Sequence, residues 1–398
     1  MTTESTFDPT APLAGPLDPW AYAPTPVRRA TPPYLMTDMI AAEPALARRI
    51  IARVAAPGGG GAELADAIRE AIADGAPIVV TGCGTSEHAA LGIVDILRDA
   101  LRAAGSTSAI VTAEQAFELS LEPLARGLVI GVSHEGGTSA TNAALRASRA
   151  AGARTAVVTV SRRSPAGEVA DIVVETAELD HSWCHTIGYV SPLLTAAAVG
   201  AALSGRPLDA DAVAGLLAAG TRDEAEAESI AGRLAGATHL LLVGSGVDRT
   251  AGREMTVKVE EAAWLPTAYR DLETLLHGHL PATGPDTGLV LILADRAGRA
   301  QRLARARQAL AAARVLGIRS AAILAADLDR EIEPELTPAG RLLVAVNASL
   351  PGPVAALLGT ATPLQLLTER IARACGTNPD LIRRDDPVYV QAADAAGG

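Results

Sequence analysis

The stretch PIVVTGCGTSE, residues 77–87, joins a short apolar strand to the start of a helix through a turn of small residues. Residues 127–138 (GLVIGVSHEGGT) and 239–250 (HLLLVGSGVDRT) have the same form. Apolar strands that alternate with helices are typical of parallel sheets covered by helices on both faces. Such sheets bind their ligands at the carboxyl ends of the strands, so we expect the chemistry after Thr81, Ser133 and Val243.

This architecture occurs twice along the chain and predicts an α/β protein of two doubly wound parallel-sheet domains in tandem. The first domain is expected at 35–206 and the second at 222–390, whereas the proline-rich residues 1–34 predict an N-terminal arm. The acidic stretch 221–228 is expected to be helical. Further strands are expected at 155–160, 172–175, 288–293, 320–324 and 341–346, and helices at 36–54, 62–74, 87–103, 138–151, 190–203, 250–263, 299–316 and 362–374.

The composition excludes several classes of protein. A net charge of −11 and only 3% aromatic residues argue against a nucleic-acid partner. No apolar run reaches the roughly 20 residues that a membrane span requires, and residues 191–204 predict a buried helix instead. Three scattered cysteines and no visible secretion signal predict a cytoplasmic protein.

The turn at 82–86 does not match a dinucleotide-binding fingerprint, because Glu87 stands where the third glycine would be. Its small residues and two hydroxyls at a helix start suit an anion or a polyol, since free backbone N–H groups and the helix dipole point there. The turn at 133–138 has two glycines and two hydroxyl side chains. Each turn is equally consistent with a capped strand-to-helix connection.

Residues 180–186 (DHSWCHT) gather two histidines and a thiol. His181, Cys184 and His185 offer three potential metal ligands without a fourth, so we expect a loop that lines a ligand site and no metal.

Glu254, Lys258 and Glu261 are spaced at i, i+4 and i+7, so they share one face of a predicted helix. One interpretation is an exposed ladder of ion pairs, each worth about 0.2–0.5 kcal/mol. The alternative places a lysine, the only one in the chain, between two carboxylates, where it can keep one of them ionised as a general base. His277 could supply a second proton-transfer group.

Together these pieces resemble the sugar isomerase (SIS) domain family over roughly residues 35–390. The resemblance is to tandem-SIS proteins such as the isomerase half of glucosamine-6-phosphate synthase and related phosphosugar isomerases and deglycases. Residues 82–86 are similar to the family's first sugar-phosphate turn, and residues 133–138 stand where the family has Ser-Gln-Ser-Gly-Glu-Thr. EMTVKVEE at 254–261 is similar to Glu-Gly-Ala-Leu-Lys-Leu-Lys-Glu, His277-Gly278 follows at the family's spacing, and PLQLL at 363–367 matches a C-terminal helix signature.

The resemblance implies two flavodoxin-like α-β-α sandwiches and an aldose–ketose isomerase or amino-sugar isomerase/deaminase. Glu261 would move a proton between C1 and C2 of an open-chain sugar through an enediol or enamine. His277 would assist ring opening, while Glu254 and Lys258 would position the substrate and the base. The implied partners are a small sugar or sugar phosphate and a second subunit that completes the site, with no cofactor. The substrate-binding residues would be Gly84, Thr85, Ser86, Ser133, His134, Glu135, Thr138 and His185.

The chain also departs from the family pattern. Glu135 replaces a serine and His134 a glutamine, and an ionised carboxylate about 4 Å from a phosphate repels it even at an effective dielectric constant of about 20. Pro387 stands where the synthase has a Schiff-base or ring-opening lysine, although Arg383 and Arg384 are nearby. Because no glutamine-hydrolysing domain precedes the first unit, glutamine-fed amination is not expected.

Three hypotheses therefore stay open. The chain is a sugar or sugar-phosphate isomerase or deaminase, a non-catalytic sugar-binding protein, or an enzyme for a non-phosphorylated or amine-bearing compound. Glu135 is the direct support for the third.

Overall fold

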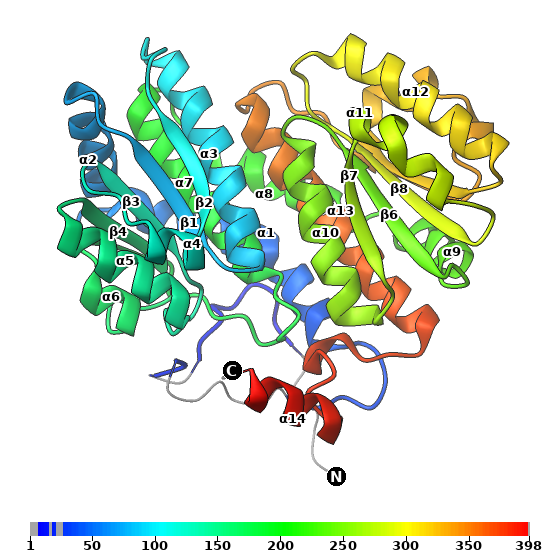
Figure 1. The fold of residues 1–398 in the computed structure, drawn as a ribbon, viewed down its shortest axis with the longest axis horizontal. Coiled ribbons are helices and arrows are strands. Elements are labelled where there is room, and N and C mark those ends of the chain that lie inside the picture. The colour runs from blue at the N-terminus through cyan, green and yellow to red at the C-terminus, as the bar shows by residue number, and fades with distance from the viewer. Residues whose placement is uncertain (1–6, 16–17, 21–26, 397–398) are drawn as a thin grey trace.

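The computed structural model describes residues 7–15, 18–20 and 27–396, and it contains two five-stranded parallel sheets (Figure 1). The strand orders are β2-β1-β3-β4-β5 and β10-β9-β8-β6-β7, which are the same order read from opposite edges. This confirms the predicted tandem of doubly wound α/β units. The strands are β1 (Ile78–Gly82), β2 (Val111–Gln115), β3 (Leu128–Val132), β4 (Arg154–Thr159), β5 (Ile172–Glu175), β6 (His239–Gly244), β7 (Thr267–Asp271), β8 (Thr287–Leu293), β9 (Arg319–Ala325) and β10 (Gly340–Val344).

Helices pack on the sheets and fill the space between the two units (Figure 1). The helices are α1 (Leu35–Ala55), α2 (Gly61–Ala73), α3 (Thr85–Ala103), α4 (Ala116–Leu121), α5 (Ser139–Ala151), α6 (Pro165–Val169), α7 (Ile187–Ser204), α8 (Ala210–Ala219), α9 (Glu224–Leu234), α10 (Asp248–Ala263), α11 (Leu272–Thr274), α12 (Arg299–Val315), α13 (Gly352–Cys375) and α14 (Pro387–Ala395). The predicted helix at 221–228 begins later, at Glu224, as part of α9.

In each sheet the first strand along the chain lies between the second and the third, so the direction in which strands are added reverses there. β1 pairs with both β2 and β3, and β6 pairs with both β7 and β8. Every residue of β1 and β3 is buried, because both strands carry apolar side chains on both faces. Because β1 and β3 are neighbouring parallel strands, the turns that follow them lie side by side at the carboxyl ends of the strands, where doubly wound folds bind their ligands.

The two units meet through α10, which packs against α3 of the first unit and against α13. α13 begins at Gly352 rather than at the expected Thr362, and Pro363 lies inside it. Residues 352–362 are apolar on every side and the helix is buried along most of its length, so no amphipathic period indicated a helix there.

Two strands were not predicted. β2 and β7 are edge strands whose sequences, VTAEQ and TAYRD, mix polar and small residues, and both are partly exposed. An edge strand needs no apolar run, because one of its sides faces solvent or a loop. The apolar central strands were therefore readable from the sequence, whereas these edges were not.

By length and hydropathy α7 is the one helix among the described residues that could cross a membrane. In this fold 83% of that helix is buried inside the protein. It packs against α1, α2 and α3 as a core helix of the first unit, as the sequence predicted for its residues 191–204.

The described residues of the N-terminal arm form hydrogen bonds with later segments of their own chain. The Leu13 N–H donates to Glu178 Oε2 at 2.8 Å, and the Leu179 N–H donates to the Leu13 carbonyl at 2.9 Å. Farther along, Asn378 Nδ2 donates to the Arg29 carbonyl at 2.9 Å, so the arm also meets the C-terminal segment at one edge of the molecule (Figure 1). Residues 1–6, 16–17 and 21–26 of the predicted arm lie outside the described residues.

Candidate functional site

Three charged side chains of α10 lie on the helix face that meets the first unit. Glu254 and Lys258 are each only 1% exposed, whereas the Glu261 side chain is 28% exposed. Lys258 Nζ donates a hydrogen bond to Glu261 Oε2 and lies 3.9 Å from Glu254 Oε1. The interpretation as an exposed ladder of ion pairs is wrong, because the lysine and one of its two acids are buried.

Glu254 connects the two units. Its Oε1 accepts a hydrogen bond from the Thr85 hydroxyl at 3.2 Å, and its Oε2 pairs with His88 Nδ1 at 2.8 Å. Both partners belong to the first turn of α3, directly after the turn at 82–86. Both carboxylate oxygens are thus occupied by partners from the first unit, which suits Glu254 to positioning rather than to proton transfer.

Lys258 stays protonated in this environment. Burial alone would lower its pKa, but the carboxylates of Glu261 and Glu254 outweigh burial and raise it above the ordinary value. The Cys184 thiol packs behind the same helix turn and donates to the Lys258 carbonyl at 3.9 Å. The lysine therefore holds a fixed positive charge beside the partly exposed carboxylate of Glu261.

The loop at 180–188 is held by one buried carboxylate. Asp180 accepts hydrogen bonds from the N–H groups of Thr186 and Ile187 at 2.7 Å each, and also from those of Ser182 and Gly188 at 3.1 and 3.3 Å. Burial raises the pKa of Asp180 to about 6, although these four N–H groups oppose that rise. The carboxylate therefore fixes the start of α7 and the loop that carries His185.

Two imidazoles line the neighbouring turn. The rings of His134 and His185 are 5.3 Å apart, and the Asp180 N–H donates to His134 Nε2 at 2.9 Å. That bond requires Nε2 to accept, so the neutral ring carries its proton on Nδ1. Burial lowers the pKa of His134 to about 4, and it also lowers that of His185, which lies near His134, Lys258 and Arg384. Both rings are therefore uncharged at neutral pH.

The hydroxyl groups of the two predicted turns lie at adjacent strand ends. Ser133 is buried and its Oγ donates to Thr138 Oγ1 at 3.3 Å, while Gly84 has a positive φ of 56° at the start of α3. Thr85 and Ser86 form the first residues of α3. The structure thus brings the predicted residues of both turns, the 180–188 loop and the face of α10 to one region between the two units.

His277 lies elsewhere. Its side chain is 69% exposed, and its Nε2 pairs with Glu273 Oε1 at 2.7 Å. Among the described residues no hydrogen bond or ion pair joins it to Glu254, Lys258 or Glu261. A single chain therefore does not place His277 beside the proposed base.

Three further residues of this region were missed as site residues. His88 lies one helical turn after Thr85, and this spacing could have indicated that the two side chains share one face of α3. Its pairing with Glu254 depends on the packing of α3 on α10. The guanidinium of Arg384 lies 5.2 Å from the centre of the Trp183 ring. The Trp183 N–H donates to the Asp380 carbonyl at 3.0 Å, so the C-terminal segment packs against the 180–188 loop.

The corresponding turn of the second unit is filled by its own side chains. Asp248 accepts from the N–H groups of Ala294 and Asp295, and Asp295 accepts from the Val247 N–H at 3.1 Å and from Arg302 at 2.7 Å. A Cβ at Gly246 would lie 2.2 Å from Arg302 Nη2. The turn after Val243, where the sequence also predicted chemistry, is thus closed by an internal network.

The histidines and thiol at 180–186 do not form a metal site. His181 Nε2 bonds the Ala14 carbonyl at 2.9 Å, Cys184 faces the Lys258 carbonyl, and His185 faces His134. Within the described part of the chain, no three His, Cys, Asp or Glu side chains converge as potential metal ligands.

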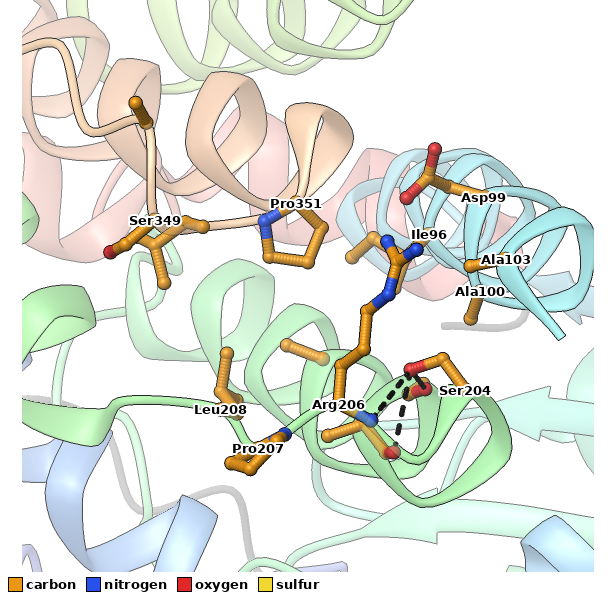
Figure 2. A pocket seen from close by; sticks show the side chains of 15 residues that line it. Ile96, Asp99, Ala100, Ala103, Ser204, Arg206, Pro207, Leu208, Ser349 and Pro351 are labelled. Atoms are coloured by element: carbon orange, nitrogen blue, oxygen red, sulfur yellow. Dashed lines mark hydrogen bonds between the residues drawn. The ribbon is translucent and has the colours of Figure 1, made fainter.

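A cavity of about 180 Å³ lies away from these residues, between α3, the end of α7 and the loop before α13 (Figure 2). Arg206 and Pro207 line it on one side, and Ser349 and Pro351 line it on the other. None of the predicted site residues lines this cavity, so the candidate site is defined by the charged face of α10 and the two turns.

Comparisons with known proteins give the family of the first unit. Residues 71–204 match the SIS domain model. Residues 71–204 form a SIS domain. The resemblance read from the sequence is thereby confirmed, and the matched residues include both turns and the 180–188 loop.

Solved structures extend the likeness to both units. The C-terminal domain of glucosamine-fructose-6-phosphate aminotransferase from Francisella tularensis aligns with a TM-score of 0.75 at 18% identity, over 89% of this chain and 99% of that one. Tagatose-6-phosphate ketose/aldose isomerase from Escherichia coli gives 0.68 at 18% identity, over 90% and 97%. Glucosamine-6-phosphate deaminase from Thermotoga maritima gives 0.57 at 16% identity, over 76% and 87%. At such identities the likeness establishes the tandem SIS fold, and no curated protein sequence matches the chain.

Proposed function

We propose that this SIS protein is a sugar isomerase or amino-sugar isomerase/deaminase that moves a proton between C1 and C2 of an open-chain sugar, with Glu261 as the base. One observation carries the proposal: the partly exposed carboxylate of Glu261 is hydrogen-bonded to the buried, protonated Lys258 at the junction of the two units. A partly exposed carboxylate that a buried neighbour holds in one orientation at the junction of the two units can take the role of a general base.

The remaining residues of α10 support that role. Lys258 orients Glu261, and its charge stabilises the negative charge that develops on the oxygen of an enediol or enamine. Glu254, held by Thr85 and His88, fixes Lys258 against the first unit. Proton transfer between neighbouring carbons transfers no electrons to the protein, so the proposed reaction needs no redox cofactor.

A small sugar or sugar derivative is the proposed ligand. Hydroxyl and amide donors at the starts of α3 and α5, together with the uncharged His134 and His185, suit a molecule with several hydroxyls. Proteins of this fold include structures named for an isomerase and a deaminase that act on sugar phosphates. The three free thiols of the chain support the proposal of a cytoplasmic location.

The proposal includes a second subunit. His277 is exposed and pairs with Glu273 rather than with a residue of α10, as expected of a residue that enters the site of a neighbouring copy. In a homodimer with two-fold symmetry each His277 would reach the partner's site, where it would assist ring opening.

Replacement of the proposed base tests this function. Glu261→Gln keeps the shape and the hydrogen-bond acceptor but removes the charge, so we expect turnover of an aldose–ketose panel to fall by about 10²-fold or more while sugar binding persists. Glu260→Gln, on the exposed side of the same helix, is the matched control and should retain wild-type turnover. Undiminished turnover in Glu261→Gln would refute the assignment.

A non-catalytic sugar-binding protein is the second candidate, and one observation favours it. Pro387, at the position where the synthase has a lysine, begins the largely exposed helix α14, and that helix contains no lysine. In that case sugars would raise the melting temperature of the protein, but no sugar of the panel would be converted and Glu261→Gln would change neither property.

A further inference from the structure

The turn between β3 and α5 is rigid. The His134 carbonyl accepts from the Val160 N–H at 2.8 Å, and the Gly136 carbonyl accepts from the Ala166 N–H at 3.0 Å and from Asn142 Nδ2 at 3.2 Å. Gly136 has a φ of +78°, and a Cβ there would lie 2.2 Å from Ser164 Oγ. The backbone therefore holds residue 135 in one place, so that the character of its side chain decides what can bind there.

Glu135 brings an unpaired carboxylate to this turn. Among the described residues no hydrogen bond or ion pair holds its side chain, which is only partly exposed. Burial raises its pKa, as does the neighbouring Asp180, while Arg384 lowers it. Glu135 and Asp180 thus lie at the same end of the site, but Asp180 already accepts hydrogen bonds from backbone N–H groups.

The surroundings of Glu135 suit a polyol. Arg384, whose charge lowers the pKa of Glu135, lies over the Trp183 ring, and a Cβ at Gly137 would lie 3.2 Å from Cβ of the arm residue Trp20. An aromatic face, a carboxylate acceptor and a guanidinium donor offer apolar contact together with both hydrogen-bonding roles. A phosphate dianion bound at this turn would be repelled by an ionised carboxylate on residue 135.

We infer that this end of the site binds hydroxyl or amino groups, so that the sugar carries no phosphate at the end held by residues 133–138. The inference rests on the proposed function, because it assumes that the sugar lies between this turn and Glu261. Glu135 would accept hydrogen bonds from sugar hydroxyls or pair with an ammonium group, and Arg384 would donate from the opposite side. Glu135 thereby acts as the residue that excludes phosphorylated sugars.

Matched pairs of sugars test this inference by isothermal titration calorimetry. The probes are glucosamine and glucosamine 6-phosphate, and fructose and fructose 6-phosphate, with the wild type, Glu135→Ser and Glu135→Gln. We expect the wild type to bind the unphosphorylated member of a pair more tightly, and Glu135→Ser to shift the preference toward the phosphorylated member by about tenfold or more. Glu135→Gln, which keeps the size of the side chain but removes its charge, should shift the preference in the same direction.

The other outcomes separate the two proposals. Tighter binding of the phosphorylated member by the wild type, lost in Arg384→Ala, would make Arg384 a phosphate ligand and overturn the inference while the proposed function stands. An unchanged preference in both Glu135 variants would also overturn it. If Glu261→Gln turns over the aldose–ketose panel as fast as the wild type, the proposed function falls first, and this inference falls with it.

Discussion

Single residues decide the charge of the junction between the two units. The spacing of Glu254, Lys258 and Glu261 was enough to predict a shared helix face, because a helix repeats every 3.6 residues. That the lysine is buried was not readable, since the burial depends on the packing of α3 and α10. For the same reason the pairing of His88 with Glu254 could not be predicted from one sequence.

Glu43 of α1 is a carboxyl group whose burial should make the stability of the protein depend on pH. It is fully buried, its Oε2 accepts from the Thr362 hydroxyl at 2.9 Å, and burial raises its pKa from 4.5 to about 8. A carboxyl whose pKa is higher in the folded state stabilises the fold below its unfolded pKa, and this contribution is lost as the pH rises from 4.5 to about 8. Glu43→Gln should therefore be more stable than the wild type at pH 8, by a few kcal/mol at about 1.4 kcal/mol per pKa unit.

Urea unfolding at pH 5 and at pH 8 measures this difference. The gain from Glu43→Gln should shrink toward zero at pH 5, where the wild-type carboxyl is protonated in the fold. Glu114→Gln, on the exposed side of β2, is the control and should change neither value. A gain that is equal at both pH values would show that charge at Glu43 is not its cause.

Secondary-structure elements were predictable where their apolar pattern was unbroken. The central strands β1, β3, β6, β8 and β9 lie close to their expected ranges, because each is buried on both faces. The pattern failed for the edge strands β2 and β7, which are partly exposed, and for the first half of α13, which is apolar on all sides. Hydrophobic periodicity reports one buried face, so it loses its signal when all faces or none are buried.

The loop before α7 depends on the carboxylate of Asp180. Asp180→Ala would leave four buried N–H groups at the start of the helix without their acceptor. We expect the free energy of unfolding to fall by about 2 kcal/mol or more, and sugar binding to weaken because the same loop carries His185. Asp209→Ala is the matched control: it removes an exposed N-cap of α8 that accepts two N–H groups, and it should cost about 1 kcal/mol. An equal decrease in the free energy of unfolding of the two variants would show that Asp180 contributes no more than an ordinary N-cap.

At the scale of the whole molecule, the repeat of turns and helices predicted two tandem units, and the strand orders confirm it. The sequence did not reveal that the two units differ at their corresponding turns. In the second unit Asp248, Asp295 and Arg302 close the turn, whereas the turn at 133–138 of the first unit carries Glu135, which is unpaired among the described residues, and places His134 beside His185. Asp248 is more than 40 residues before Asp295 and Arg302 in the sequence, so only the fold shows that the three form one network.

The proposed exchange of His277 between subunits predicts complementation. Glu261→Gln and His277→Ala should each be nearly inactive, but after mixing and re-association a mixed dimer would have one site with neither substitution. Random pairing should then restore up to about a quarter of wild-type activity. Size-exclusion chromatography with light scattering checks that dimers form. Mixed dimers without any recovery would place His277 outside the active site.

The proton that Glu261 is proposed to move can be followed directly. In D2O, NMR spectroscopy measures deuterium incorporation at C2 of an aldose or amino sugar that the protein binds. We expect steady incorporation with the wild type and with Glu260→Gln, and none above background with Glu261→Gln, which still binds the sugar. Incorporation by Glu261→Gln at the wild-type rate would show that Glu261 is not the base.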